Sequence, residues 1–358
     1  MYIKGDEYIY DISFRQAQIE ITGKCNMHCK HCRASFDKKS DMPIDIISNI
    51  VDFAMENGGD NTEVILSGGE PLLHKDFSDI LDMLKEKKIK KLIITTNGSI
   101  NIEPYLDKIK SFNSLISISL DSINKEKHDE FRGYKGAFDK AINTIKILNN
   151  NNIKTNIRTS IIPEDIDKIP DIAKFVHNLG VKRLSISSII PTGRALENKE
   201  LFMTKEEKQK FIEQVNKTRQ EYLEKNMQVI TSDPLRNICN ECCESHMEDS
   251  IVIEGCTAGI TNFNVNSNGD LTPCAMLNKK VLNVFETAKE EISDKYANSE
   301  IIKNLVTRNL KGKCSNCKLK NRCGGCRARA ENVNGDYLHE DPDCWLEVAK
   351  INEECMSL

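Results

Sequence analysis

The chain lacks a long hydrophobic run, since no stretch approaches the roughly 18 consecutive apolar residues that a membrane-spanning helix needs. It also lacks a secretory signal, because residues 1–10 carry Lys4, Asp6 and Glu7 where a signal has a basic start and an apolar run. A strong charge bias is missing too: 50 basic residues stand against 54 acidic ones, and the net charge is -4. Nucleic-acid binding normally needs a basic stripe. We therefore expect a cytoplasmic protein with no membrane and no nucleic-acid partner.

Cysteine is absent from residues 33–238, although the chain has 14 cysteines. Three lie within residues 25–32 and the other eleven lie between residues 239 and 355. In a reducing cytosol disulfides rarely persist, and closely spaced cysteines more often indicate metal binding or catalysis. With 358 residues, of which 39% are hydrophobic, the chain has enough apolar material for one large domain or two ordinary ones.

Short β-rich runs alternate with helical patterns over residues 16–188. The expected strands are 16–22, 63–67, 91–96, 115–120, 154–161 and 181–187, and the expected helices lie near 44–57, 76–88, 102–111, 136–150 and 165–179. Six β-then-α units in order predict a parallel sheet with helices outside, because parallel strands need crossover connections. Six units rather than eight favour a partial barrel over a closed one. The chemistry is then expected at the carboxyl ends of the strands.

The pattern changes after residue 200. Residues 204–225 form a strongly charged helix, which we interpret as a bridge or outer cover with a solvated face. Residues 261–265 and 271–274, joined through Asn268-Gly269, predict a hairpin. Beyond residue 310 the Cys/Gly-rich stretch has too little apolar content for a core of its own, so metal is expected to hold it. We place a domain boundary near residue 230, with an α/β partial barrel at 1–230 and a small Cys-rich α+β domain at 231–358.

The first cysteine group follows the first expected strand. Cys25, Cys29 and Cys32 have the spacing C-x3-C-x2-C. Three close thiolates can hold three corners of a 4Fe-4S cube and leave the fourth iron open to a small molecule, whereas a closed electron-transfer cluster uses four cysteines. The alternatives are a zinc site completed by His28 or His31, and three buried thiols.

A second motif, Gly68-Gly69-Glu70-Pro71, follows the second expected strand. Two glycines let the backbone approach a ligand closely, and the proline stiffens the residues after it. Together with Thr-Thr-Asn-Gly at 95–98 and Ser-Ile-Ser-Leu-Asp-Ser at 117–122, these residues give the chain a resemblance to radical S-adenosylmethionine (SAM) enzymes over roughly residues 16–195.

The resemblance implies a partial (β/α)6 barrel in which SAM binds the open iron through its amino and carboxylate groups. Reductive cleavage then gives methionine and a 5′-deoxyadenosyl radical that abstracts hydrogen from the substrate. The SAM-contact residues implied are His31, Gly68, Gly69, Glu70, Pro71, Asn97, Ser119, Asp121 and Arg132. The Gly68–Pro71 segment should hold the methionyl amino group, and His31 should lie near adenine. The alternatives are an exposed histidine at position 31 and a helix N-cap at Asp121.

The C-terminal cysteines resemble the SPASM extension of radical SAM enzymes, although the sixth follows x2 rather than the usual x3. The resemblance implies two auxiliary clusters, one at Cys314, Cys317, Cys323 and Cys344, and a second, nearer the active site, at Cys256, Cys274 and Cys326. The cofactors would then be SAM and three 4Fe-4S clusters. The alternative is a zinc ribbon, for which paired C-x2-C is typical.

The second auxiliary set lacks one cysteine that relatives with a complete cluster have. Either one iron is open to a substrate thiolate, or the fourth ligand comes from Cys239, Cys242 or Cys243. Thiol exchange is another role for these three residues, and buried or incidental thiols are the remaining interpretation.

Our leading hypothesis is a radical SAM peptide maturase that forms a thioether, or a C–C crosslink, in a ribosomally made peptide. The first alternative is porphyrin modification of the haem or haem d1 type, because Pro191–Ala195 and Cys323–Ala330 look like haem-pathway members. Further alternatives are a peptide epimerase and formylglycine-type oxidation, and Ala275 weakens the latter because that subfamily has Asp there. A non-catalytic iron-sulfur carrier or sensor is the alternative from another class, against which the intact Gly68–Pro71 motif argues.

The partners implied are a precursor peptide, with cysteine if a thioether forms, and an electron donor such as ferredoxin or flavodoxin. Many peptide maturases carry a leader-binding domain before the barrel, and only about fifteen residues precede the first expected strand here. Leader recognition is therefore expected from the barrel surface or from a separate leader-binding protein. No residue for proton transfer emerges from the sequence.

Overall fold

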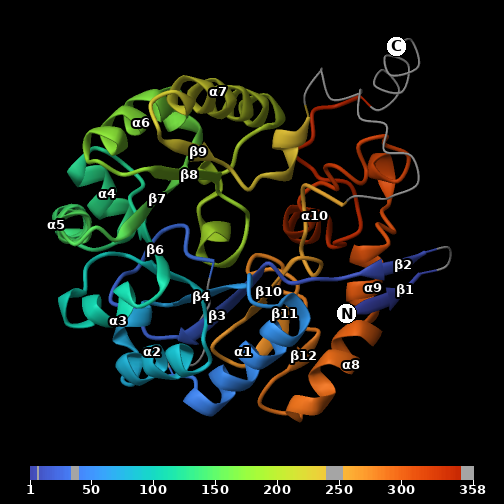
Figure 1. Ribbon diagram of the computed structural model, residues 1–358. Coiled ribbons are helices and arrows are strands. Elements are labelled where there is room, and N and C mark those ends of the chain that lie inside the picture. Colours follow the sequence, from blue (N-terminus) through green and yellow to red (C-terminus); the bar gives the residue numbers. More distant parts are fainter. Residues whose placement is uncertain (6–7, 34–39, 239–252, 348–358) are drawn as a thin grey trace.

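The computed structural model describes residues 1–5, 8–33, 40–238 and 253–347 (Figure 1). A ten-stranded sheet has the order β12-β11-β10-β3-β4-β5-β6-β7-β8-β9, and β1 (Tyr2–Lys4) and β2 (Ile9–Asp11) form a separate hairpin. The strands of the large sheet are β3 (Gln16–Thr22), β4 (Glu63–Gly68), β5 (Lys91–Thr96), β6 (Asn113–Ser119), β7 (Lys154–Ile161), β8 (Arg183–Ser188), β9 (Gln228–Ile230), β10 (Asn262–Val265), β11 (Asp270–Thr272) and β12 (Leu282–Asn283).

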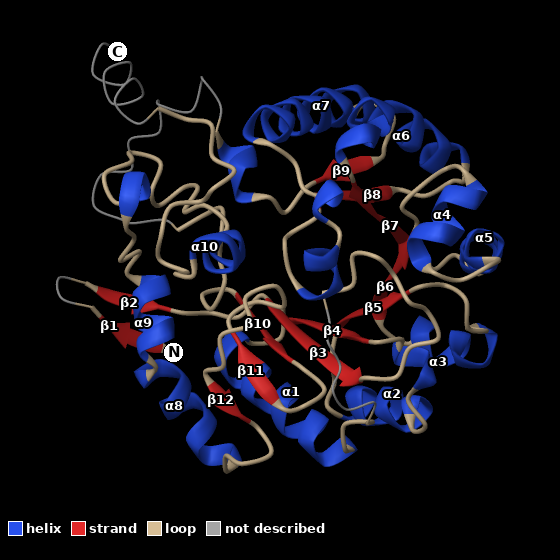
Figure 2. Cartoon of the chain, turned by 180° about the vertical axis from the view of Figure 1, so that it is seen from behind, coloured by secondary structure: helices blue, strands red, loops and turns tan. Residues whose placement is uncertain are grey.

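Strands β3 to β8 pair in parallel and in chain order, which confirms the predicted partial barrel. Helices cover its outer face (Figure 2). They are α1 (Ile44–Gly58), α2 (Phe77–Glu86), α3 (Leu106–Lys110), α4 (Lys125–Arg132), α5 (Ala137–Asn150) and α6 (Ile169–Asn178). Helix α1 shows why they pack there: Ile47, Ile50, Val51 and Ala54 recur at helical spacing and are all buried.

Two of the expected helices, near 102–111 and 165–179, are not α-helical from their first residue. Each begins with a segment of 3-10 helix. Glu103–Tyr105 precedes α3, and Pro163–Lys168 precedes α6. Proline at the first or second helical position explains both starts, because it fixes φ and donates no backbone hydrogen bond. The last expected strand, at 181–187, is Arg183–Ser188 in the structure.

Helix α7 (Lys205–Leu223) covers the barrel beside β9. It begins at Thr204 with a capping box, in which Thr204 accepts from the backbone of Glu207 and the Glu207 side chain accepts from the backbone of Thr204. Phe211, Ile212 and Val215 are buried against the barrel. Lys208 is buried as well, so the interpretation of this helix as a solvated charged face is wrong for that residue.

The C-terminal part continues the barrel sheet. Strands β10 and β11 form the predicted hairpin, and β10 pairs in parallel with β3, so the sheet runs from one part into the other. Helices α8 (Ile292–Asn298), α9 (Glu300–Val306) and α10 (Arg327–Asn334) complete this part. No helix among the described residues is long and apolar enough to cross a membrane.

Candidate functional site

The first cysteine group lies in the loop after β3, at the carboxyl edge of the parallel sheet. Cys25, Cys29 and Cys32 line a cavity of about 1020 Å³ inside the barrel. Burial is the main cause that raises the pKa of Cys25 to about 11; a hydrogen bond from the Met27 N–H opposes it, and Glu70 and the Cys29 and Cys32 thiols add to it. Three thiols thus lie on one short loop that opens into the cavity.

Gly68 and Gly69 hold this loop against the end of β4. The backbone N–H groups of Gly69 and Glu70 donate to the loop: Gly69 N–H to Thr22 O at 2.8 Å and Glu70 N–H to Lys24 O at 2.7 Å. Gly68 has φ +140, and a Cβ there would lie 2.3 Å from Thr22 O. A Cβ at Gly69 would lie 2.1 Å from Lys24 O. We expected these glycines to let the backbone approach a ligand. The structure shows that they also let the backbone of β4 approach Thr22 and Lys24, which lead into the cysteine loop.

Glu70 is fully buried behind the cavity wall. Its carboxylate accepts hydrogen bonds from Thr96 Oγ1 at 2.7 Å and from Asn97 N–H at 2.8 Å. Burial outweighs these bonds and raises the pKa of Glu70 to about 7. Pro71 begins a 3-10 turn beside it, while Gly68, Gly69 and Asn97 line the cavity itself.

His31 also lines the cavity and stacks on Phe131, with ring centroids 4.5 Å apart and planes 8° apart. Burial lowers its pKa to about 4, so the ring is neutral at pH 7. Its Nδ1 is buried and has no hydrogen-bond partner among the described residues. The alternative of an exposed histidine is therefore wrong, and the unpartnered nitrogen fits a ligand such as adenine.

Asp121 and Arg132 form a buried ion pair next to the cysteine loop. Arg132 Nε donates to Asp121 Oδ2 at 2.6 Å, and its Nη1 lies 3.7 Å from Cys29 Sγ. Burial opposes ionisation of Asp121, but the Arg132 guanidinium holds its pKa below the usual value. The N-cap of α4 is Asn124, so the interpretation of Asp121 as a helix N-cap is wrong. Ser119 ends β6 at the cavity wall.

Apart from Arg132, the arginines of the cavity were not predicted as site residues; they include Arg158, Arg183, Arg194 and Arg236. Arg158 projects from β7, and no carboxylate pairs with it in the part of the chain that the structure describes. The side chain of Arg158 is exposed to the cavity, yet desolvation by the cavity walls and the nearby Arg33 and Arg132 lower its pKa against the effect of Asp121. Strand register could have identified Arg158 as a cavity residue, because Arg158 of β7 pairs with Ser119 of β6, and Ser119 was already a predicted site residue. Arg158 therefore offers a positive charge that no carboxylate pairs with, among the described residues, to an anionic group in the cavity.

The C-terminal cysteines fall into two groups, as expected. Cys256, Cys274 and Cys326 line the same cavity as the first group. The other four line a separate, smaller cavity with Leu235, Ile238, Leu319 and Leu346; they are Cys314, Cys317, Cys323 and Cys344. The Cys256 N–H donates to Cys323 O at 2.9 Å, so one backbone hydrogen bond joins the two groups. Cys239, Cys242 and Cys243 lie outside the described residues.

The donor sets consist of thiols, which are the ligands that iron-sulfur clusters take. Over the described residues, no group of three His, Cys, Asp or Glu side chains is arranged to hold one metal ion. A 4Fe-4S cube instead takes each thiolate at a separate iron. None of the ten described cysteines forms a disulfide, and all ten belong to the three groups.

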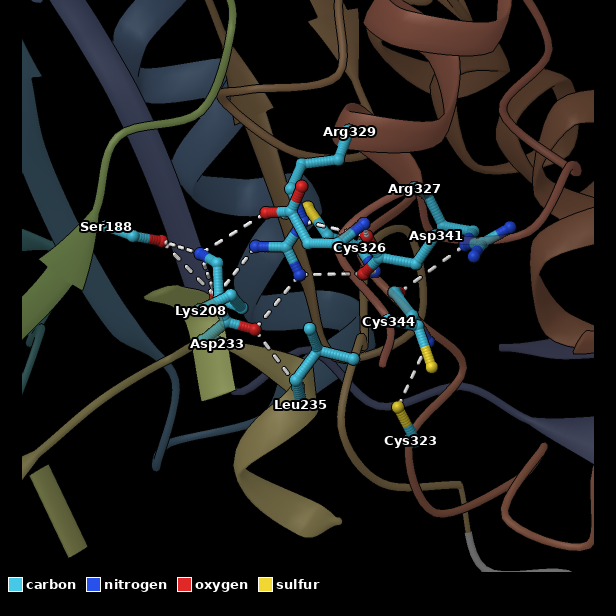
Figure 3. Close-up of polar contacts among 12 residues, drawn as sticks. Ser188, Lys208, Asp233, Leu235, Cys323, Cys326, Arg327, Arg329, Asp341 and Cys344 are labelled. Carbon is cyan, nitrogen blue, oxygen red and sulfur yellow. Dashed lines mark hydrogen bonds and ion pairs between the residues drawn. The ribbon is translucent and has the colours of Figure 1, made fainter. Parts of the chain in front are cut away.

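A buried ionic network joins the barrel to the C-terminal part (Figure 3). Arg329 lies between Asp233 and Asp341: its Nη1 is 2.7 Å from Asp233 Oδ2, and its Nη2 is 2.7 Å from Asp341 Oδ2. Lys208 of α7 contacts Asp233 at 3.2 Å and Asp343 at 3.4 Å. Asp341 also accepts from the Cys326 N–H at 2.6 Å, which ties the network to the second auxiliary group.

Comparison with known proteins gives two family matches. Residues 19–176 match the Radical SAM superfamily, and residues 256–318 match SPASM, an iron-sulfur cluster-binding domain. Similar proteins include the AdoMet-dependent heme synthase of Methanosarcina barkeri, 27% identical over 91% of this chain and 94% of that protein. The subtilosin biosynthesis protein AlbA of Bacillus subtilis is 28% identical over 94% of this chain and 72% of that protein. The structure of SuiB from Streptococcus suis bound to its precursor peptide SuiA superimposes with TM-score 0.74 and 20% identity, covering 93% of this chain and 76% of that one.

Proposed function

The chain belongs to the radical SAM superfamily and carries a C-terminal SPASM domain, and we propose from this that Cys25, Cys29 and Cys32 hold a SAM-binding 4Fe-4S cluster. We assign the two C-terminal cysteine groups to two auxiliary clusters. When bound, the first cluster and SAM supply a 5′-deoxyadenosyl radical that abstracts hydrogen from a substrate. We further propose that this substrate is a ribosomally made peptide and that the product is a thioether or C–C crosslink.

The residues around the first group have complementary tasks in this proposal. The Gly68 and Gly69 backbone and the Asn97 side chain border the methionyl end of SAM. The neutral His31 ring offers a flat face and an unpartnered Nδ1 to adenine. Arg158 is exposed to the cavity and has no carboxylate partner among the described residues, so we assign it to pair with the SAM carboxylate. The Asp121–Arg132 pair fixes Arg132 against Cys29 and thereby orients the cysteine loop.

One observation carries the peptide assignment: the Cys256, Cys274 and Cys326 group faces the same cavity as the first group. Three thiols of this group lie in the described ranges, and we propose that the fourth ligand is a substrate thiolate rather than Cys239, Cys242 or Cys243. A thioether crosslink replaces one peptide C–H bond and one cysteine S–H bond by a C–S bond: the deoxyadenosyl group takes the hydrogen atom from carbon, and the thiol gives up its proton when it binds as thiolate. The one electron left over would pass to the auxiliary cluster that Cys256, Cys274 and Cys326 would hold. The similarity to AlbA, whose name places it in subtilosin biosynthesis, supports the same choice.

A second candidate is porphyrin modification. The cavity arginines, four of which are Arg158, Arg183, Arg194 and Arg236, suit a substrate with several carboxylates. Relatives named as AdoMet-dependent heme synthases match this chain over 91–92% of its length, which supports the same alternative.

The general proposal is tested on anaerobically reconstituted protein. We expect iron and sulfide for three 4Fe-4S clusters, and release of 5′-deoxyadenosine when SAM is added with a reductant or with reduced ferredoxin or flavodoxin. Replacing Cys25, Cys29 and Cys32 by Ala should abolish this release and leave the auxiliary iron in place. Iron for one cluster, with zinc at the C-terminal cysteines, would contradict the auxiliary assignment.

The substrate class is tested with paired probes. We expect a cysteine-containing peptide, encoded as a short open reading frame beside the gene, to change the EPR spectrum of an auxiliary cluster and to lose mass on turnover. The control is the same peptide with serine in place of cysteine, which should leave the EPR spectrum unchanged. If Fe-coproporphyrin III is consumed and the peptide is not, the porphyrin candidate replaces the peptide one.

A further inference from the structure

Two arginines beside the C-terminal cysteines are buried without a counter-ion. Arg308 is 2% exposed and Arg327 is 1% exposed. Neither has a carboxylate within ion-pair distance among the residues that the structure describes, and each keeps a buried N–H without an acceptor, Nε in Arg308 and Nη2 in Arg327. Arg329, two positions further along, shows the contrast, because it is held by Asp233 and Asp341 on opposite sides.

Arg308 lies where the two auxiliary cysteine groups meet. Its Nη2 donates to Glu254 O at 2.9 Å and to Cys256 O at 2.5 Å. Its guanidinium packs against Gly324, where a Cβ would lie 1.9 Å from Nη1. Gly324 follows Cys323, and Cys323 O accepts from Cys256 N–H. Arg308 therefore contacts the backbone that joins the Cys256 group to the Cys323 group.

The backbone at this position is itself unfavourable for arginine. Arg308 has φ 52, in the left-handed region that favours glycine. Asparagine or glycine after α9 would meet this geometry at lower cost. Arginine at position 308 therefore carries two energetic costs, one for its left-handed backbone and one for burying its charge.

A buried charge with no opposite charge strongly destabilises a folded protein. Two carbonyl oxygens compensate Arg308 only in part, since they carry no net charge. Thiolate-bound iron-sulfur clusters are held by several anionic ligands, and their reduction potentials respond to nearby charge and hydrogen bonds. Arg308 lies beside both cysteine groups, carries a positive charge and keeps its buried Nε–H without an acceptor. These are the properties that a residue compensating a negatively charged cluster needs.

We propose that Arg308 is the shared counter-ion of the two auxiliary clusters. This inference rests on the proposed function, because it presupposes that both cysteine groups carry iron-sulfur clusters. The guanidinium stabilises the extra negative charge of each reduced cluster and so raises both reduction potentials. Arg308 is a positioning residue that acts through the clusters, and Arg327, on the other side of the Gly324–Gly325 pair, adds to the same positive region.

The test compares Arg308→Gln, which removes the charge but keeps hydrogen-bond donors, with Arg308→Lys, which keeps the charge. EPR-monitored redox titration of the loaded full-length protein should show both auxiliary signals shifted by Arg308→Gln. We expect at least a tenfold change in each reduction equilibrium, equivalent to about 59 mV for a one-electron couple. Arg308→Lys should stay within threefold of the wild-type equilibrium.

Stability of the metal-free chain provides a second readout. Arg308→Gln should leave its urea midpoint unchanged or raise it, because an uncompensated charge is removed. Arg329→Met, the paired control, should lower that midpoint. The proposal is overturned if the wild-type protein holds both auxiliary clusters and Arg308→Gln moves neither potential. It is also overturned if Arg308→Gln destabilises the metal-free chain as much as Arg329→Met does. A wild-type protein without auxiliary iron would instead overturn the proposed function, so the two failures are distinguishable.

Discussion

Replacing Arg329 by methionine is the sharpest test of how the barrel and the C-terminal part are held together. The guanidinium donates four hydrogen bonds to carboxylates, two to Asp233 and two to Asp341. Both carboxylates are buried, and their separation of 96 and 12 positions from Arg329 shows that the contact joins distant segments. Arg329→Met leaves these carboxylates facing each other, and among the described residues Lys208 is then the one cation within ion-pair distance of the Asp233 carboxylate.

Removing one partner from a buried ion pair costs about 3–5 kcal/mol. For 358 residues at roughly 2.1 cal/mol/K each, this lowers the apparent unfolding temperature by about 4–7 °C. The assay is urea unfolding of the metal-free chain, followed by circular dichroism, with thermal unfolding alongside. A loss below about 1 kcal/mol would refute the reasoning, because it would place the network in the range of exposed surface pairs.

Asp343→Asn is the matched control within the same network. Burial raises the pKa of Asp343 above its ordinary 3.8, although Arg329 and Lys208 lower it. The folded chain then holds this proton more tightly than the unfolded chain, and stability falls as pH rises from 3.8 through the folded-state pKa. Asp343→Asn removes this dependence, so at pH 7 we expect unchanged or higher stability. A loss as large as that of Arg329→Met would show that Asp343 is needed in its charged form.

Three further predictions concern single buried groups. Burial raises the pKa of Glu70 from 4.5 to about 7, so the stability that the protonated carboxyl contributes is lost as pH rises between these values. The urea midpoint of the wild type should therefore fall from pH 5 to pH 8, and that of Glu70→Gln should fall less. Gly68→Ala should cost about 1–3 kcal/mol in urea unfolding, because a Cβ would meet Thr22 O in a strained backbone, and iron analysis should show loss of one cluster. Tyr296→Phe should cost about 1 kcal/mol in urea unfolding, because the hydroxyl donates to Gly259 O at 2.8 Å inside the core.

The barrel could be predicted from the sequence because the patterns that mark its strands and helices each lie within a short stretch of the chain. Strands β4 and β5 have six residues each, with three consecutive apolar residues near the start, and helices such as α5 repeat their apolar positions at helical spacing. The three-residue strands β1, β2 and β9 were missed, because three positions are too few to show an alternation. The split helices were missed because proline within a helical pattern was not weighed against the pattern itself.

The ionic part of the site was not predictable in the same way. Lys208 looks like one more charge on a charged helix, and its partner Asp233 lies 25 positions away on another element. Arg308 and Arg327 belong to a residue type that is mostly exposed, whereas the structure buries both. The cysteine groups were predictable because a thiol's chemistry depends on residue type and spacing; the burial of a cation depends on packing that only the fold creates.

The parallel pairing of β10 with β3 has a consequence for how the protein folds. Strand β3 is synthesised first among the strands of the large sheet, yet residues 262–265, its partners on one side, follow only after the rest of the barrel has been made. Until then β3 presents an uncovered strand edge, which is a site for pairing with other chains. A chain cut within residues 231–255 keeps that edge open permanently. We therefore expect the barrel part to aggregate when produced alone, and the sheet to close late, when the C-terminal residues arrive.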